Sequence, residues 1–427
     1  MKKFVLKLPP KRQRLIYYQL YLVFFMFWMR DILHFPSAIT YITDIITIII
    51  CISRFETVKR TLKISENKTQ LAIIWLIMFS MLFGALIHFT NPALVLWAMR
   101  NDLRFFVFFI LCISLLDELD ISRIMHFFMN MFWINVVLCS VQYFLWGIKN
   151  DYLGGFFGVT KGCNTYINIL ICIVCAYAIV RFMNRNMSPV IFILIILSSV
   201  YLATLCELKV VYVEIVIIYC IAIISNKPSI KTIVTVILGI VLGVIIVRIA
   251  SIYAPRLIKI FFDREAQLIY LAGNGYTNTG DLNRFTAIKQ IHELFFKHNF
   301  LDSLFGFGIG NCEYSSFEFL QSDFAKKYSY LHYRWFSHAW IYLEQGAVGI
   351  CLYILFFLNI GKKCISSKNV GNKEWIQFAL LFVPICLLSM MYNCAIQTEA
   401  AYIVAFVCSI PFVVCEREKN RGILNDK

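Results

Sequence analysis

The residues of this sequence best suited to chemistry are an arginine and a histidine far apart in its second half. Arg284 follows a Gly-Asp-Leu-Asn turn and begins a segment with helical spacing, and His338 stands where a polar segment enters an apolar run. Arginine binds phosphate with a planar fork of donors and stays charged. Histidine exchanges its proton near neutral pH, so it is a natural general base for a hydroxyl. The alternatives are a solvated loop arginine and a histidine at a membrane surface.

A second group of cations could also hold a phosphate. Arg100 and Arg104 are four residues apart, on one face of an apolar helix. Charged side chains inside membrane spans are costly, so each needs a reason. The two arginines either bind a phosphate at the membrane surface or extend their side chains to the interface.

Carboxylates and glycines complete the candidates. Glu207 and Lys209 flank a short polar break between two apolar runs, where they either pair to hold a hairpin or contact a polar substrate. Glu344 follows His338 but does not share its helical face. The stretch Phe305-Gly306-Phe307-Gly308-Ile309-Gly310 follows no strand that opens a βαβ unit, so we do not expect a dinucleotide site, but it permits a close-packed turn or an approach of backbone to a ligand.

The sequence predicts neither a metal centre nor a cofactor. The histidines of residues 252–337 do not have the spacing of a metal motif, and most of the 15 cysteines lie inside apolar runs, where cysteine behaves as a small hydrophobe.

The amino-acid composition indicates which class of protein contains these candidate residues. Hydrophobic residues make up 60% of the 427 residues, charged residues only 15%, and mean hydropathy is +0.73. A soluble globular enzyme, a disordered chain and a coiled coil are excluded, because none can hide this much apolar surface. The net charge of +15 therefore indicates basic cytoplasmic loops rather than nucleic acid binding.

Runs of about 20 apolar residues predict membrane-spanning helices. The fold expected is an all-α polytopic membrane protein with about 12 such helices and one long extracytoplasmic loop containing amphipathic helices. The runs cover residues 15–30, 32–52, 71–89, 93–116, 124–147, 163–182, 189–205, 208–225, 232–251, 338–360, 375–394 and 397–415.

The basic residues give the orientation. Most of the 40 Lys and Arg residues fall on one side of this arrangement, which places both termini in the cytoplasm. The chain is thus divided into helices 1–9 within residues 1–251, the long outer loop 252–337, helices 10–12 within 338–415, and a cytoplasmic tail 416–427. In the loop, residues 251–264 and 284–300 have helical spacing, and Phe285, Ile288, Ile291 and Phe295 would share the apolar face of the second segment.

The order of these features resembles the O-antigen polymerase and ligase family. The resemblance rests on Arg284, the glycine stretch, Ser337-His338-Ala339-Trp340, Leu343-Glu344-Gln345-Gly346, Met99–Arg104 and Asn150–Gly158, and it covers residues 90–360. Ala339 stands where members often have asparagine, and Glu207-Leu208-Lys209 replaces their Ser-Arg pair. These departures favour the polymerase branch.

The resemblance implies a bacterial cytoplasmic-membrane enzyme that acts on oligosaccharide repeat units carried by undecaprenyl diphosphate. His338 would take a proton from an acceptor sugar hydroxyl. Arg284, Arg100 and Arg104, with Lys161 and Arg334, would hold the departing diphosphate. Membrane lipids and a chain-length regulator are the implied partners. A ligase that transfers finished polymer is the alternative within the family, and a polysaccharide flippase is the alternative from another class.

Overall fold

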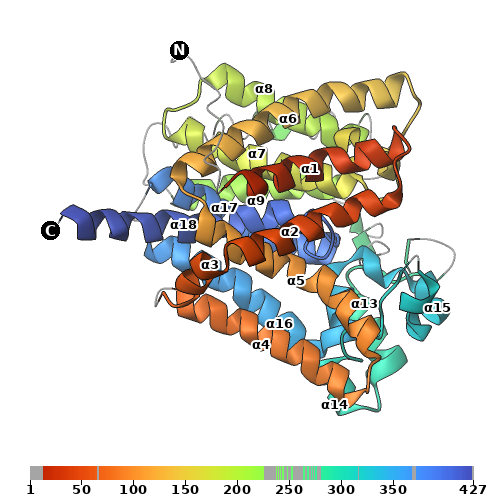
Figure 1. Cartoon of the computed structure of the whole chain (residues 1–427). Coiled ribbons are helices and arrows are strands. Elements are labelled where there is room, and N and C mark those ends of the chain that lie inside the picture. Colours follow the sequence, from red (N-terminus) through yellow and green to blue (C-terminus); the bar gives the residue numbers. More distant parts are fainter. Residues whose placement is uncertain are drawn as a thin grey trace.

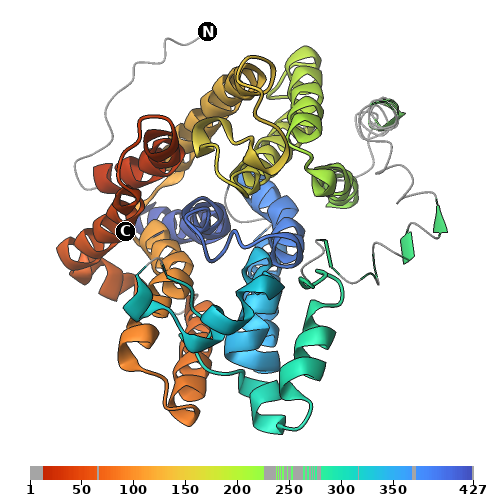
Figure 2. The ribbon, with the colours of Figure 1, turned by 90° about the vertical axis from the view of Figure 1, so that its right-hand side faces the viewer.

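The chain folds into a bundle of helices that run side by side (Figures 1 and 2). The computed structural model describes residues 13–64, 67–225, 280–315, 317–367 and 372–425, with scattered positions between 237 and 276. Within these residues it contains helices and no strand. The bundle helices are α1 (Arg14–Asp31), α2 (Ile42–Ser53), α3 (Phe55–Leu62), α4 (Lys68–Ile87), α5 (Pro92–Leu115), α6 (Glu118–Phe144), α7 (Asn164–Met183), α8 (Pro189–Leu205), α9 (Lys209–Ser225), α16 (Ser337–Ser366), α17 (Lys373–Tyr392) and α18 (Ala401–Asn425).

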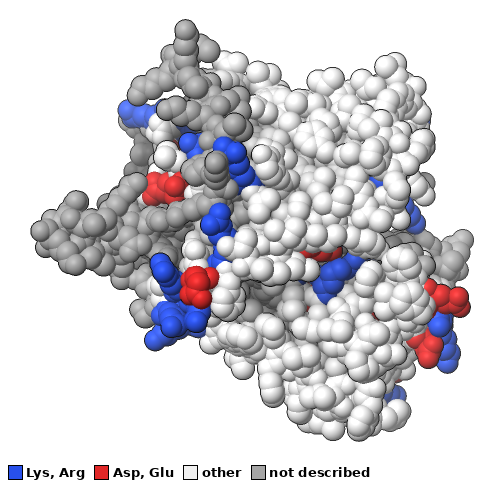
Figure 3. Space-filling model, in the orientation of Figure 1, with Lys and Arg blue, Asp and Glu red and all other residues white. Residues whose placement is uncertain are grey.

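The surface of this bundle is apolar in the way of a membrane protein. Trp75, Phe79 and Leu86 on α4, and Ile48 and Ile52 on α2, are exposed. Figure 3 shows broad uncharged surfaces over these helices, whereas basic side chains gather near α3. Such exposed apolar faces fit contact with lipid. The chain is therefore a helical membrane protein.

Among the described residues, five helices are long and apolar enough to cross a membrane, namely α4, α6, α7, α16 and α17. A sixth is reached if Ser37–Ser53 and Phe55–Leu62, which meet at an angle of 78°, form one broken span. Helix α8 and residues Ala401–Cys415 of α18 are apolar but shorter.

Helix α18 lies at the centre of the bundle. Its residues Ala401–Cys415 are all buried, and it packs against α5, α17, α16, α1, α6 and α7. In Figure 2 the other helices surround it. The residues that precede it, 393–400, which include Gln397, Thr398 and Glu399, therefore reach the middle of one end of the bundle.

The predicted apolar run 32–52 is wrong as one helix. Pro36 and the short 3₁₀ helix η1 (Ser37–Tyr41) occupy its first part, and α2 begins only at Ile42. Proline lacks an amide donor and disfavours helix in the residue before it, which explains the late start. The predicted helix 232–251 lies outside the well-described residues, and so does most of the segment 251–264.

The described part of the predicted loop has a small core of its own. It comprises α13 (Ala287–Ile291), the π-helical turn η5 (His292–Phe296), α14 (Phe300–Phe305), η6 (Glu318–Leu320), α15 (Asp323–Tyr328), η7 (Ser329–Leu331) and η8 (Tyr333–Trp335). Leu282, Ile291 and Phe296 pack there against Tyr342 and Leu343 of α16. We call the end of the bundle that carries these elements the loop end.

The predicted apolar face of residues 284–300 is only partly correct. Ile291 is buried, but Phe285 and Ile288 are exposed, and Ala287 and Phe296 take their places in the core. The π-helical turn adds a residue per turn, which places Phe296 on the buried side five residues after Ile291, while Phe295 is only partly buried.

Candidate functional site

A cavity of about 710 Å³ opens at the loop end, and we call it the arginine cavity. It lies between the end of α1, the start of α7, the α8–α9 turn, the segment after α17 and the residues before α16. Its charged lining residues are Arg30, Asp151, Lys161, Glu207, Lys209 and Arg284. Four of the residues proposed from sequence thus meet in one cavity, although they are distant along the chain.

Aromatic rings surround the guanidinium of Arg284. Its central carbon lies 4.0 Å from the ring centre of Tyr392 and 4.8 Å from that of Tyr276. The ring of Phe336 is 5.2 Å away, and the Tyr276 hydroxyl accepts a hydrogen bond of 2.8 Å from Nε. Cation–π contacts hold the guanidinium in place without neutralising its charge. Arg284 is therefore a positioned guanidinium in the wall of the cavity.

His338 lies behind this arginine and does not line the cavity. Its Nε2 is 2.8 Å from the backbone oxygen of Arg284, and its Nδ1 is 3.1 Å from that of Met390. Both partners are acceptors, so a neutral ring satisfies one of them and only the doubly protonated ring satisfies both. Neither nitrogen is turned toward a ligand. The geometry makes His338 the residue that holds the backbone of Arg284 against α17.

We expect the reaction rate of His338→Gln to remain well above that of His338→Ala. A glutamine amide can still donate to one of the two carbonyls, whereas alanine leaves both without a donor. Loss of such a buried hydrogen bond corresponds to roughly a 10- to 100-fold fall in rate. Rates of both variants, measured across a pH series, test this. A glutamine variant as inactive as the alanine variant at every pH would instead make His338 the proton acceptor.

Two lysines extend the positive lining. The Lys161 ammonium lies 4.8 Å from the ring centre of Trp335, and Lys209 begins α9. In the described part of the chain, neither has a carboxylate within ion-pair distance, unlike Arg30, whose Nε is 2.6 Å from Asp31 Oδ1. The cavity thus keeps positive charge available for an anion.

Glu207 is exposed at the turn between α8 and α9, where its φ is +52°. Its carboxylate accepts no hydrogen bond from another described residue, whereas Asp151 accepts one of 3.0 Å from Asn164. The predicted Glu207–Lys209 pair is absent among the described ion pairs. Glu207 therefore adds an available carboxylate to the same lining.

Arg104 lies in a different place. It is buried, and it donates two hydrogen bonds to Asp44, of 2.9 and 3.0 Å, while its Nη1 is 3.4 Å from Glu399 Oε1. The Tyr402 hydroxyl also donates to Asp44, at 2.6 Å. Two carboxylates thus balance the charge of Arg104, which ties α5 to α2 and to the start of α18.

Arg100 and Arg334 line a smaller cavity of about 190 Å³ beside Arg104, which we call the salt-bridge cavity. Arg334 Nη2 is 3.6 Å from Glu313 Oε1, and Asn101 donates to the same oxygen at 3.0 Å. Burial raises the pKa of Glu313, and the two arginines oppose this rise. The acidic and basic groups here counterbalance each other, so this cavity is less suited to a diphosphate than the arginine cavity. Figure 3 shows a hollow with basic and acidic atoms between uncharged surfaces.

At the glycine stretch the backbone of the loop crosses those of α4 and α16 in close contact. Gly306, Gly308 and Gly310 have φ of +66°, +84° and +90°. A Cβ on Gly308 would lie 2.6 Å from the backbone of Gly84 and Ala85 in α4, and one on Gly306 would lie 2.5 Å from that of Gln345. Only glycine fits these positions.

The crossing coincides with a break in α16 at Gly346, which has φ +62° and ψ −158°. The amides of Phe307 and Gly308 donate to the carbonyls of Leu343 and Glu344, at 2.7 and 3.0 Å, which the break would otherwise leave without donors. The Glu344 carboxylate accepts from the amides of Gly310 and Cys312, at 3.1 and 3.3 Å. Glu344 and the glycines therefore fix the loop to α16 and do not line the arginine cavity.

Sequence reasoning missed the partners of these cations. Asp44 and Glu399 were within or beside predicted apolar runs, and the cost of charge in a membrane was the signal that could have identified them as partners for Arg104. The rings of Tyr276 and Tyr392 carried no such signal, because tyrosine is common at membrane surfaces.

Neither a scan of protein-family models nor a search of curated proteins finds a match for this chain.

Proposed function

We propose that this protein is a polymerase of lipid-linked oligosaccharides, which transfers glycan from undecaprenyl diphosphate to a sugar hydroxyl. The observation that carries the proposal is the arginine cavity, where Arg284, Lys161 and Lys209 present positive charge at the end of a membrane bundle. Aromatic rings of Tyr166, Trp335 and other residues line the same cavity and suit the apolar faces of sugars. A substrate with a lipid tail explains why its enzyme is embedded in a membrane.

The reaction needs few groups. The oxygen of the acceptor hydroxyl bonds to the anomeric carbon of the donor, and the bond from that carbon to the diphosphate oxygen breaks. The diphosphate leaves with the electron pair, and Arg284 and Lys161 stabilise its charge. The hydroxyl proton passes to a carboxylate, for which Glu207 is placed in the same cavity. His338 acts by positioning Arg284, and the step requires no nucleotide sugar.

The proposal includes the topology expected from sequence. About 12 spans, with both termini in the cytoplasm, would put Arg54, Lys59 and Arg60 near α3 on the cytoplasmic side. The loop end would then face outward, where flipped lipid-linked oligosaccharides are found. The opposite placement of α3 and the loop elements in Figure 1 is compatible with this orientation in a bacterial cytoplasmic membrane.

Purified protein in lipid nanodiscs provides the direct test. Incubation with a repeat unit on undecaprenyl diphosphate should give a ladder of longer lipid-linked products and release undecaprenyl diphosphate. Glu207→Gln should slow the ladder by roughly 100-fold, as expected for loss of a general base, with Glu293→Gln on the exposed face of η5 as the control. No ladder from well-folded protein would refute the polymerase assignment.

The second candidate is ligation of finished polymer to another acceptor, and the same cavity could bind that donor. It is distinguished by its products. A ligase would give a single transfer to an added acceptor and no ladder, whereas a polymerase would elongate the lipid-linked donor itself.

A further inference from the structure

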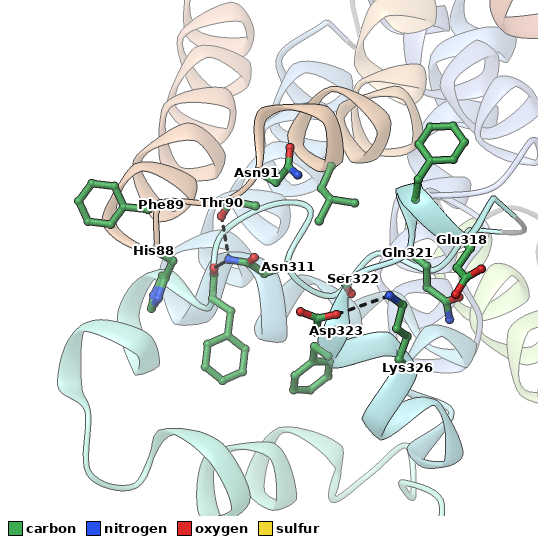
Figure 4. A pocket seen from close by; sticks show the side chains of 14 residues that line it. His88, Phe89, Thr90, Asn91, Asn311, Glu318, Gln321, Ser322, Asp323 and Lys326 are labelled. Atoms are coloured by element: carbon green, nitrogen blue, oxygen red, sulfur yellow. Dashed lines mark hydrogen bonds and ion pairs between the residues drawn. The ribbon is translucent and has the colours of Figure 1, made fainter.

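A third cavity, of about 530 Å³, lies at the loop end beside the turn between α4 and α5, and nothing described above uses it. We call it the amide cavity, after Asn91, Asn311 and Gln321 (Figure 4). The carboxylates of Glu318 and Asp323 line it as well. Asn311 is anchored, because its amide donates to the Thr90 hydroxyl at 2.7 Å. The side chains of Glu318 and Gln321 make no hydrogen bond to another described residue, so their polar atoms are available to a ligand.

The residues that line the amide cavity indicate which class of ligand it can bind. Amides donate and accept hydrogen bonds, and carboxylates accept them, which matches hydroxyl groups that do both. The Lys326 ammonium lies 3.6 Å from an Asp323 oxygen, and His88 Nε2 lies 3.2 Å from Asp302 Oδ1, so each basic side chain that lines the cavity faces a carboxylate. An uncharged, hydroxyl-rich molecule fits this lining better than an anionic headgroup.

Aromatic side chains at the rim strengthen this selection. Phe319 is 77% exposed and Phe89 is 93% exposed, and both line the cavity. Phe89 also has φ of +49°, a conformation that is costly for a bulky residue. Exposed rings beside amides and carboxylates are the combination that a saccharide requires, because its carbon-bound hydrogens cover rings while its hydroxyls bind polar groups.

The three cavities are linked through shared segments. Asn311 lines the amide cavity, and Glu313 and Tyr314, just beyond it, line the salt-bridge cavity. Thr398 lines both the salt-bridge cavity and the arginine cavity. A chain held at the reacting centre therefore has a row of polar cavities along the loop end.

We propose that the amide cavity binds saccharide units of the glycan at a distance from the bond being made. This inference rests on the proposed function, since it supplies the glycan. It predicts that the protein holds a growing chain at two places, at the diphosphate in the arginine cavity and at neutral sugars in the amide cavity.

The test uses the full-length protein in nanodiscs and, as probe, lipid-free oligosaccharides of a few repeat units, released by mild acid from cells that make the polymer. Phe319→Ala and Gln321→Ala should each weaken binding by about 5- to 50-fold in calorimetry. The same variants should shorten the polymer in cells. Leu294→Ala, which truncates another exposed apolar side chain outside the three cavities, is the control and should bind as the wild type does.

Each other result has a defined meaning. Wild-type binding and polymer length in both variants would overturn the proposal, and so would binding of soluble glycerophosphate in place of the oligosaccharide, which would assign a lipid headgroup. The nanodisc reaction separates this inference from the proposed function. A well-folded wild-type protein that makes no ladder refutes the proposed function, whereas a normal ladder together with oligosaccharide binding unaffected by Phe319→Ala refutes only the amide cavity.

Discussion

Arg284→Ala should abolish polymer formation while the protein still accumulates in the membrane. Three aromatic rings surround the guanidinium in the arginine cavity, with the Tyr392 ring at 4.0 Å and the Tyr276 ring at 4.8 Å. Removing a charge aimed at a leaving group costs roughly 100- to 1,000-fold in rate. The measurement is the glycan ladder from cells, together with the initial rate in nanodiscs.

Two variants sharpen this result. Arg284→Lys keeps the charge but loses the planar fork and its stacking, so we expect a partial rate. Lys289→Ala removes an exposed cation from the same segment and should leave the ladder unchanged, because Lys289 lines none of the three cavities described above and lies 3.9 Å from Glu293. Equal losses in all three variants would show that Arg284 has no special role.

Arg104→Ala should destabilise the protein more than any other loss of a cation at the loop end. The Arg104 side chain is 1% exposed, and its removal leaves the carboxylates of Asp44 and Glu399 without their shared partner. Breaking a buried ion pair in this way costs about 3–5 kcal/mol. Unfolding of the purified protein in mixed micelles, followed by titration with denaturing detergent, measures the difference.

Arg100→Ala is the matched control for Arg104→Ala. Arg100 is on the same face of α5, but its side chain is 23% exposed and its Nε is 3.8 Å from Asp44. A weak and partly solvated pair contributes at most about 1 kcal/mol. A loss for Arg100→Ala as large as that for Arg104→Ala would contradict the assignment of Arg104 as the residue that joins three helices.

Hydropathy alone predicts much of the bundle. The expected run 189–205 coincides with α8 (Pro189–Leu205), and the runs at α4, α5, α7 and α17 differ from the helices by a few residues. Local signals explain this agreement, since a run of apolar residues needs only its own composition to favour a helix in lipid. The run 32–52 failed because Pro36 interrupts it, and this signal was present in the sequence.

The candidate site was less predictable, because it depends on which ends of which helices meet. Arg284, Lys161, Glu207 and Lys209 were all proposed, and they share one cavity. Arg104 and Arg100 looked equivalent in sequence, yet one is buried between two carboxylates and the other is partly exposed. Both arginines face Asp44, and it is Glu399, far away along the chain, that gives Arg104 its second carboxylate, so no local pattern contains the difference.

The central position of α18 has a consequence for assembly. Translation produces α5, α6, α7, α16 and α17 before the helix on which all of them pack. Until Ala401–Cys415 is inserted, the earlier helices lack the helix on which they pack, and Arg104 lacks Glu399 as a partner. The bundle therefore completes its core only after this last helix is made, together with Thr398, which lines two of the cavities. A chain that ends before residue 400 lacks the central helix on which the others pack.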